Sequence, residues 1–419
     1  MTKKRNEIPE EAAWRLEDMI ENQETWERLY EEVSREADRY QEFKGTLGQS
    51  AQRLLEGLKF DDDISQKIER LYVYARMRSD EDTAGQQYQD MVSRAQSLSV
   101  RAAELSSYMV PEILAIPDEQ MDAFRKSGNG LVLYDRLLSQ LIKRKDHTLS
   151  DEMEALLAAA QDATQGGSQV FRMFNNADVR FPSIRGTDGR EISVTHGTYI
   201  SLMEHPDRRI RREAFQSLYG VYRQYSNTLA AAFGANVKQA VFYAKARKYS
   251  SSREYFLSAN EVPEAVYDRL ISSVRKGLPV LHRYISLRKK LLKLNELHMY
   301  DVYVPLVSEA DKHYTFEEAK KMVKEGLAPM GKEYLSLLEE GFGNRWIDVY
   351  ENEGKRSGAY SWGIYGCHPY VLLNFHGTLK DVFTLAHEMG HAIHTWYSNE
   401  SQPYIYAGYK IFVAEVAST

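Results

Sequence analysis

Apolar residues recur at intervals of three and four along most of the chain, and this spacing predicts a succession of amphipathic helices. Up to about residue 177 few Gly or Pro residues interrupt the pattern. The helices expected in this part cover residues 26–40, 64–78, 86–108, 118–126 and 151–162. Breaks are expected at the acidic run 60–63, at Pro111, at Pro117 and at 128–130, because turn-forming residues gather there.

A β-hairpin is predicted next, because residues 178–184 and 190–194 alternate around a turn-rich loop at 186–189. We place a domain boundary just after it, between an N-terminal helical lobe, residues 1–195, that ends in the hairpin and a second domain, residues 196–419. Helices resume at Asp207, and an extended link is expected at 301–307. The further helices expected cover residues 222–243, 263–294 and 316–339.

A basic cluster begins the second domain, and its members are Arg208, Arg209, Arg211 and Arg212. We expect these side chains to form a solvated helix face. Four arginines without interleaved aromatic residues are a poor signal for nucleic-acid binding.

Two short strands are predicted at 358–363 and 370–375, directly before a helix at 378–396. Thr378 and Asp381 have the spacing of a capping box, and the helix is apolar around most of its circumference, so we expect it to be buried. The second strand runs straight into this helix. We expect it to offer unpaired backbone groups to an extended peptide; the alternative is that both strands are only core sheet.

Composition fits an ordinary globular chain: 419 residues, 43% hydrophobic and 27% charged, with a net charge of −6. That charge argues against a nucleic-acid partner. The charged N-terminus lacks the apolar core of a signal peptide, and no run approaches the roughly 20 apolar residues of a membrane span. We therefore expect a cytoplasmic protein without a membrane partner. Cys367 is the only cysteine, which excludes an intrachain disulfide, and we interpret it as a small packed thiol.

The helix at 378–396 carries His387, Glu388 and His391 in the spacing H-E-x-x-H. Residues i and i+4 share a helix face, so the two imidazoles are placed to bind one Zn²⁺ while Glu388 acts as the general base. The alternative is a pair of core histidines, satisfied by backbone carbonyls, beside a chance glutamate.

A third ligand is needed, and the extension H-x-x-G-x-x-H fails because residue 394 is His and residue 397 is Tyr. Two acidic candidates follow. Glu400 lies in a polar stretch and is interpreted as the solvated end of the helix. Glu415 lies in an apolar run, where a carboxylate is costly unless it is bound, so we assign Glu415 as the third ligand.

Three further histidines lie near the motif in sequence. His394 is a candidate to contact and orient the metal ligands, although a packed histidine that is hydrogen-bonded to the backbone is more common. His376 and His368 are weaker candidates for substrate contacts.

The run HPYVLLNFHGTLKDVFTLAHEMGHAIH, followed by FVAEVAST, resembles the oligoendopeptidase F branch of the thimet oligopeptidase family. The resemblance implies that zinc is bound by His387, His391 and Glu415 and that Glu388 is the general base. Angiotensin-converting-enzyme-like dipeptidyl carboxypeptidases share the HEMGH pentad and are the nearest alternative. The flanking HPYVLLNFHGTL favours oligoendopeptidase F.

The expected fold is mainly α: a multi-helix, zincin-like metallopeptidase with a small β-sheet beside the HExxH helix and a deep groove. The expected activity is zinc-dependent hydrolysis of short unfolded peptides, with one zinc ion per chain. A non-catalytic helical peptide-binding protein that keeps zinc as a staple is a second alternative. Structural zinc normally has four protein ligands, and only three candidates are visible, which favours catalysis.

The apolar run 411–417 shows no helix-ending signal before the last residue. The resemblance implies a further helical portion that closes the groove and carries Tyr and His side chains toward the substrate. From this we expect a C-terminally truncated catalytic domain whose activity is impaired, with apolar surface exposed around Phe412 and Val416.

Overall fold

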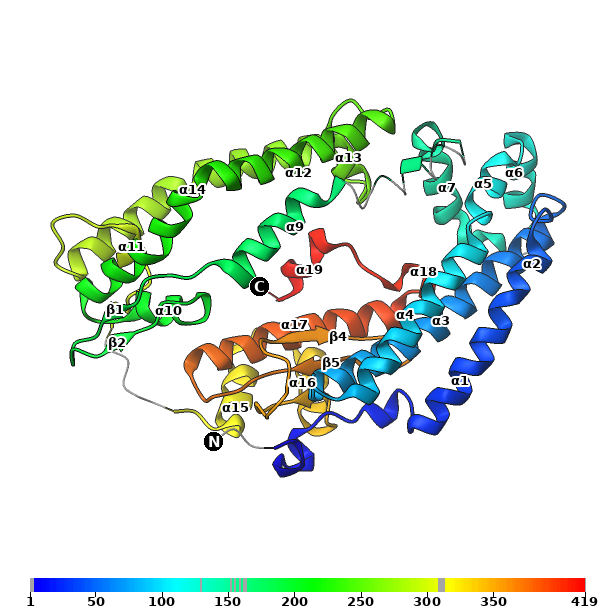
Figure 1. Ribbon diagram of the computed structural model, residues 1–419. Coiled ribbons are helices and arrows are strands. Elements are labelled where there is room, and N and C mark those ends of the chain that lie inside the picture. The colour runs from blue at the N-terminus through cyan, green and yellow to red at the C-terminus, as the bar shows by residue number, and fades with distance from the viewer. Residues whose placement is uncertain are drawn as a thin grey trace. The chain divides into compact units, whose positions relative to one another are not determined.

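The computed structural model describes residues 4–128, 130–150, 153, 156–157, 160, 164–307 and 313–418. Contacts divide the chain into two compact units. Unit 1 consists of Met1–Lys143 and Lys312–Thr419, and unit 2 is Arg144–Asp311. Helices dominate both units, which confirms the predicted mainly α class (Figure 1).

Unit 1 consists of helices of very different lengths and one small sheet. Its helices are α1 Gln23–Glu36, α2 Tyr40–Phe43, α3 Ala51–Glu81, α4 Gln86–Ser106, α5 Met109–Ala115, α6 Asp118–Lys126, α7 Asp135–Lys143, α15 Phe316–Gly326, α16 Lys332–Gly343, α17 Leu379–Ser401, α18 Tyr404–Ala407 and α19 Ile411–Ser418. Its strands are β3 Ile347–Asp348, β4 Tyr360–Trp362 and β5 Tyr370–Leu372.

The sheet of unit 1 separates two apolar clusters. Its order is β3-β5-β4, with β5 parallel to β3 and antiparallel to β4. Successive strand residues point to opposite faces. Accordingly Tyr370 and Leu372 pack into a cluster with α3 and α4, whereas Val371 and Leu373 pack into another with α15 and α17. The sheet therefore holds α17 in place from one side (Figure 1).

Unit 2 is built from helices and one very short hairpin. Its elements are α9 Gly166–Met173, β1 Ile184–Arg185, β2 Glu191–Ile192, α10 His196–Glu204, α11 Arg208–Gln224, α12 Ser226–Ala246, α13 Ser252–Ser258 and α14 Glu264–Leu291. The predicted hairpin is confirmed, although each strand has only two residues. The helix predicted at 151–162 falls largely outside the described residues.

One predicted helix break is wrong, and another lies a few residues earlier than predicted, between α4 and α5. The acidic run 60–63 lies inside the continuous helix α3, because Tyr40 donates to Asp61 and Tyr134 donates to Asp62, each through its hydroxyl. Pro111 lies in the first turn of α5, where a backbone N–H has no helical partner to lose. Pro117 does precede a helix, as predicted.

Two segments that were each predicted as one helix are divided between two helices. The helix predicted at 316–339 is split into α15 and α16 by a 3₁₀ turn, Ala328–Met330, that ends at Gly331 with φ +96°. The segment predicted at 222–243 belongs to two helices, α11 and α12, which meet at Tyr225.

The division into units differs from the boundary placed at 195/196. The hairpin that was assigned to the N-terminal lobe packs on helices that follow it, since Ile184 and Val194 share a cluster with Leu202 and Ile210. Unit 2 is thus an insertion between two parts of unit 1. The sequence pattern gave no sign that residues 312–419 pack with residues 1–143, because the two segments are separated by the whole of unit 2.

The arginine cluster of α11 is not a solvated face. Arg211 is buried and binds Asp301 at 3.0 Å, and Arg208 binds the same carboxylate at 2.8 Å. Arg209 binds Glu213 at 2.9 Å, so only Arg212 fits the prediction of an exposed side chain. The extended link predicted at 301–307 is wrong at its start, since Asp301 ends a 3₁₀ turn and is fully buried.

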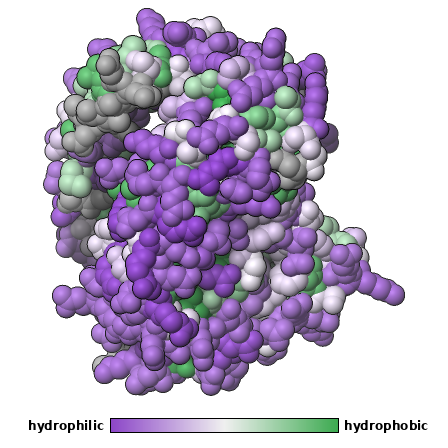
Figure 2. All heavy atoms as spheres, turned by 90° about the vertical axis from the view of Figure 1, so that its right-hand side faces the viewer, coloured by the Kyte–Doolittle hydropathy of each residue, from purple (hydrophilic) through white to green (hydrophobic). Residues whose placement is uncertain are grey.

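The face of the molecule on the right of Figure 1, where α1 and α2 lie, is covered mostly by hydrophilic residues (Figure 2). Amphipathic helices produce such a surface when their apolar stripes face the core. None of the helices in the described part of the chain combines the length and the apolar character needed to cross a membrane.

Candidate metal centre and peptide site

Helix α17 starts at a fixed position because its N-terminus is capped on both sides. The N–H of Asp381 donates to the Thr378 hydroxyl at 3.2 Å, and the Thr378 N–H donates back to the Asp381 carboxylate at 2.9 Å. This confirms the predicted capping box. Gly377 before it has φ +83°, and a Cβ there would lie 2.8 Å from the carbonyl oxygen of Tyr314.

One face of α17 is anchored in the apolar core of unit 1. Leu385, Met389 and Ala392 have no exposed surface, and they pack with residues of α15, α16 and the sheet. The other face is more open than predicted, since Phe383 is 68% exposed. The core face fixes the helix, and the open face carries the polar groups.

The two histidines and Glu415 come together on this open face. The carboxylate Oε2 of Glu415 lies 3.6 Å from Nε2 of His387 and 3.7 Å from Nε2 of His391. The two imidazole rings are perpendicular, with centroids 4.8 Å apart. Among the described residues this is the one group of three such side chains with ligand atoms within 4.8 Å of one another.

Gly390 allows α19 to approach close enough to bring Glu415 to the histidines. A Cβ at position 390 would lie 2.8 Å from the carbonyl oxygen of Ala417 and 2.9 Å from Cα of Ser418. Such distances are shorter than real Cβ contacts, so any larger residue would displace α19. The glycine inside the HExxH motif therefore has a structural role that the sequence analysis missed.

Glu388 lies on α17 close to His387 and to Ser361 of β4. It is 8% exposed, and burial raises the pKa of its carboxyl group while the nearby His387 opposes the shift. The backbone N–H of Ser361, in β4, donates to it. Burial and the neighbouring His387 also lower the pKa of His391, which favours the neutral imidazole that can bind a metal.

The strand with an open edge is β4, not the predicted β5. Because β5 pairs with β3 on one side and β4 on the other, its backbone groups are used inside the sheet. In an antiparallel pair, alternate residues turn their backbone groups away from the partner. Ser361 is such a residue, because its N–H reaches Glu388, so its backbone faces the open edge beside the histidines.

Two of the other histidines, His394 and His368, stack on aromatic side chains. His394 stacks on Tyr409 with centroids 3.8 Å apart, and burial lowers its pKa. His368 stacks on Trp346 and its Nε2 lies 3.1 Å from Asp18. His376 is exposed and precedes α17, and its Nε2 lies 3.9 Å from a carboxylate oxygen of Glu351.

Cys367 is half-buried, and its sulfur lies 3.5 Å from the Tyr370 hydroxyl. Burial raises the pKa of the thiol. Both observations agree with the interpretation of a packed thiol. Glu400 lies exposed near the end of α17, as expected.

A groove of about 950 Å³ runs beside the histidine pair. Residues of α15, α16, α17 and α19 line it, and they include His387, Glu388, Phe383 and Val416. Val416 is 75% exposed and Phe412 is 54% exposed, so the apolar surface expected there is present.

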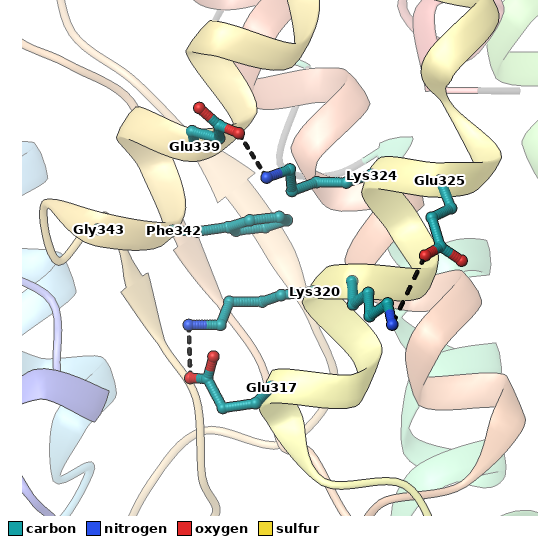
Figure 3. Close-up of a pocket in the computed structure, with 8 residues that line it drawn as sticks. Glu317, Lys320, Lys324, Glu325, Glu339, Phe342 and Gly343 are labelled. Atoms are coloured by element: carbon teal, nitrogen blue, oxygen red, sulfur yellow. Dashed lines mark hydrogen bonds and ion pairs between the residues drawn. The ribbon is translucent and has the colours of Figure 1, made fainter.

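A second hollow, of about 480 Å³, lies between α15 and α16 (Figure 3). Its lysines already have carboxylate partners: Lys324 binds Glu339, and Lys320 binds Glu317. The figure shows these pairs around the ring of Phe342. Paired surface charges of this kind are ordinary for exposed helices and define no ligand site.

Comparison with known proteins gives the family. The model of peptidase family M3 matches residues 201–419, and the model described as oligopeptidase F matches residues 112–181. Oligopeptidase PepF of Bacillus subtilis is 46% identical over 99% of this chain and 62% of its own length. Group B oligopeptidase PepB of Streptococcus agalactiae is 41% identical over the whole chain and 70% of its own length.

Solved structures agree with this result. A crystal structure from Chlamydophila abortus aligns with a TM-score of 0.88 and 31% identity, covering the whole chain and 70% of that protein. Oligoendopeptidase F from Enterococcus faecium aligns with a TM-score of 0.65 and 37% identity, covering 94% of this chain and 65% of its own. The chain thus spans about two thirds of the length of the relatives it matches.

The fold and these likenesses define the class as that of the helical metallopeptidases. The chain belongs to peptidase family M3, and it does so in the oligoendopeptidase F branch that its sequence resembles.

Proposed function

We propose that this chain is the catalytic portion of a zinc-dependent oligoendopeptidase, which hydrolyses peptide bonds in short, unfolded peptides. The observation that carries the proposal is the meeting of His387, His391 and Glu415 beside a buried Glu388 at an open strand edge.

The side chains present fit a zinc ion. Ligand atoms of a tetrahedral zinc, bonded at about 2.0–2.1 Å, lie roughly 3.4 Å from one another. The separations of Glu415 from the two histidines, 3.6 and 3.7 Å, are close to that value. We propose His387, His391 and Glu415 as the ligands of one zinc ion, which would polarise the scissile carbonyl and lower the pKa of water.

Glu388 is proposed as the general base. Its carboxylate is held by the Ser361 N–H and by helix α17, so it has a fixed place from which to take a proton from the attacking water. Burial raises its pKa, which makes it a stronger base and a competent donor of the same proton to the leaving amine.

The open edge of β4 is proposed to hold the substrate. An extended peptide can add to a strand edge through main-chain hydrogen bonds, which require no particular side chains. A folded protein cannot present an unpaired extended segment so readily. This favours short, unfolded substrates, in agreement with the relatives named oligopeptidase and oligoendopeptidase.

Replacing Glu388 by Gln tests the central role. The amide keeps the shape of the side chain, so the variant is expected to retain one zinc per chain by elemental analysis. Hydrolysis of a quenched peptide should fall by about a thousandfold or more, because the base is lost. The matched control is Glu400→Gln on the same helix, which should keep full activity.

Digestion of a peptide mixture, with mass-spectrometric detection of the cleavage positions, identifies the mode of action. Internal cleavage supports an oligoendopeptidase, whereas release of dipeptides from the carboxyl end supports the dipeptidyl carboxypeptidase alternative. Zinc binding without any hydrolysis by the unmodified chain would support the zinc-stapled binding protein instead.

A further inference from the structure

A small hollow at the far end of the open strand has the chemistry of a site for an organic cation. Its volume is about 240 Å³. Pockets for drug-sized ligands have roughly 300–1,000 Å³, so this one suits a single side chain. Ser361 and Trp362 of β4, with Gly363 directly after the strand, line one side, and Glu69 of α3 lines another.

Glu69 is the one charged residue among those that line this hollow, and the other walls are largely aromatic. The aromatic members are Trp362, Tyr365, Tyr404 and Tyr409. A carboxylate in a hollow lined by aromatic residues is an arrangement that can attract ammonium and guanidinium groups.

The Glu69 carboxylate has no cationic nitrogen within 4 Å among the residues that the structure describes. Arg70 follows it in sequence, but the guanidinium of Arg70 donates to the carbonyl oxygens of Met19 and Tyr365. Burial raises the pKa of Glu69, and the Tyr404 hydroxyl and the Arg70 charge only partly oppose that shift. A cation from outside would therefore stabilise this carboxylate.

A second acidic side chain lines a neighbouring hollow of about 570 Å³ between α3 and α4. This hollow shares Glu69 with the first hollow, and Asp61 also lines it. Its described lining holds no Lys, Arg or His side chain. Asp61 already accepts a hydrogen bond from the Tyr40 hydroxyl, so Glu69 is the carboxylate that the two hollows share for a ligand.

The spacing along α17 between Glu388, the proposed base, and Thr395, which lines the hollow with Glu69, can be estimated from helix geometry. A Cβ at Gly363 would lie 2.6 Å from Cγ2 of Thr395, so this end of β4 touches α17 at Thr395. Thr395 follows Glu388 by seven residues, which is about 10 Å along a helix. An extended peptide covers that distance in about three residues.

We propose that Glu69 is a specificity-determining residue, which binds a cationic group of the substrate two or three residues from the bond that is cleaved. The cation is either a lysine or arginine side chain or the free amino terminus of a short peptide. This inference rests on the proposed peptidase function and adds a substrate class to it.

The test uses quenched peptides of one sequence, in which a single lysine or norleucine is moved through successive positions. Each peptide is made with a free and with an acetylated amino terminus. The unmodified chain should prefer lysine at one position by roughly tenfold or more in kcat/KM. In Glu69→Gln the ratio of the two rates should fall to within about twofold of one.

Two further variants exclude a merely structural explanation. Glu56→Gln, an exposed position on the same helix, should keep the lysine preference. Glu69→Lys should reverse the preference at that position toward glutamate, which a folding defect would not produce. If acetylation alone abolishes the preference, the bound cation is the amino terminus of the peptide.

Binding separates this inference from the proposed function. Fluorescence anisotropy with the Glu388→Gln protein compares the lysine and norleucine peptides without turnover. Absence of hydrolysis by the unmodified chain would count against the peptidase function alone. Equal affinity for both peptides, or a lysine preference that survives in the Glu69→Gln background, would overturn the role of Glu69.

Discussion

The helix that carries the proposed zinc ligands and the long helices of unit 2 are held in place in different ways. In unit 1, two large clusters of buried apolar side chains enclose the sheet, and α17 contributes Leu385, Met389 and Ala392 to one of them. In unit 2 the apolar cluster is much smaller. Its helix α14 has 28 residues, of which only Arg288 is buried.

Unit 2 compensates with a buried polar node around Asp301. Arg208 and Arg211 donate to its carboxylate, and Arg288 donates to its backbone oxygen at 3.0 Å. The His298 N–H completes the set at 3.0 Å. The node joins α11 and α14 to the 3₁₀ turn. Unit 1 has a buried ion pair as well, between Lys355 and Asp348 at 2.6 Å, but its helix α17 is held by apolar side chains.

This contrast bears on function. Apolar packing has no titrating groups, so the helix that carries the proposed zinc ligands is held by forces that pH hardly changes. A buried charge cluster is stable only while every partner is present and ionised. We therefore expect unit 2 to unfold more readily than unit 1 when a charge of the Asp301 node is removed.

The largest effect is expected from Asp301→Asn. Removing one partner of a buried charge cluster leaves the others uncompensated and costs about 3–5 kcal/mol. Urea unfolding followed by proteolysis should show residues 144–311 becoming sensitive before unit 1 does. Asp268→Asn, at an exposed ion pair with Arg253, is the control and should cost less than about 1 kcal/mol.

A smaller effect is expected from Gly390→Ala, which tests the close packing of α19 against α17. The added methyl group would press on Ala417 and Ser418 and move α19, at a cost of about 1–3 kcal/mol. Because Glu415 moves with α19, zinc affinity should fall by about ten- to a hundredfold, measured by competition with a chelator.

Gly343→Ala is the control for this prediction. No atom lies within 4 Å of a Cβ at position 343, so the change should be neutral or slightly stabilising. Unchanged zinc affinity in Gly390→Ala would show that α19 adjusts without displacing Glu415.

Local patterns predicted much of the site. The spacing of His387 and His391 and the capping box need only one helix, and both are present as predicted. Glu415 was assigned from the cost of a carboxylate in an apolar run, and the structure brings it beside both histidines. Each inference depended on residues close together in sequence.

Features that depend on distant parts of the chain were missed. Strand β3 has two residues and gives no pattern, yet it makes β5 the central strand and leaves β4 at the edge. The burial of Arg211 depends on Asp301, ninety residues away. No local periodicity shows such a partner, so the arginines were interpreted as solvated.

The smallest effect expected is the pH dependence that Asp301 gives to unit 2. Burial alone would raise the pKa of Asp301, but hydrogen bonds from Arg208, His298 and Arg211 outweigh it and lower the pKa to about 2. The pKa of an unperturbed Asp is 3.8. The ionised carboxylate therefore contributes stability that is complete above about pH 5 and is lost as the pH falls through 2, in total about 2 kcal/mol.

The urea midpoint of unit 2, measured by proteolysis at pH 6 and pH 3, should fall further in the unmodified chain than in Asp301→Asn, because the variant has no carboxylate to protonate at this position. Equal acid sensitivity of the two proteins would show that the Asp301 node is not the pH-dependent element of unit 2.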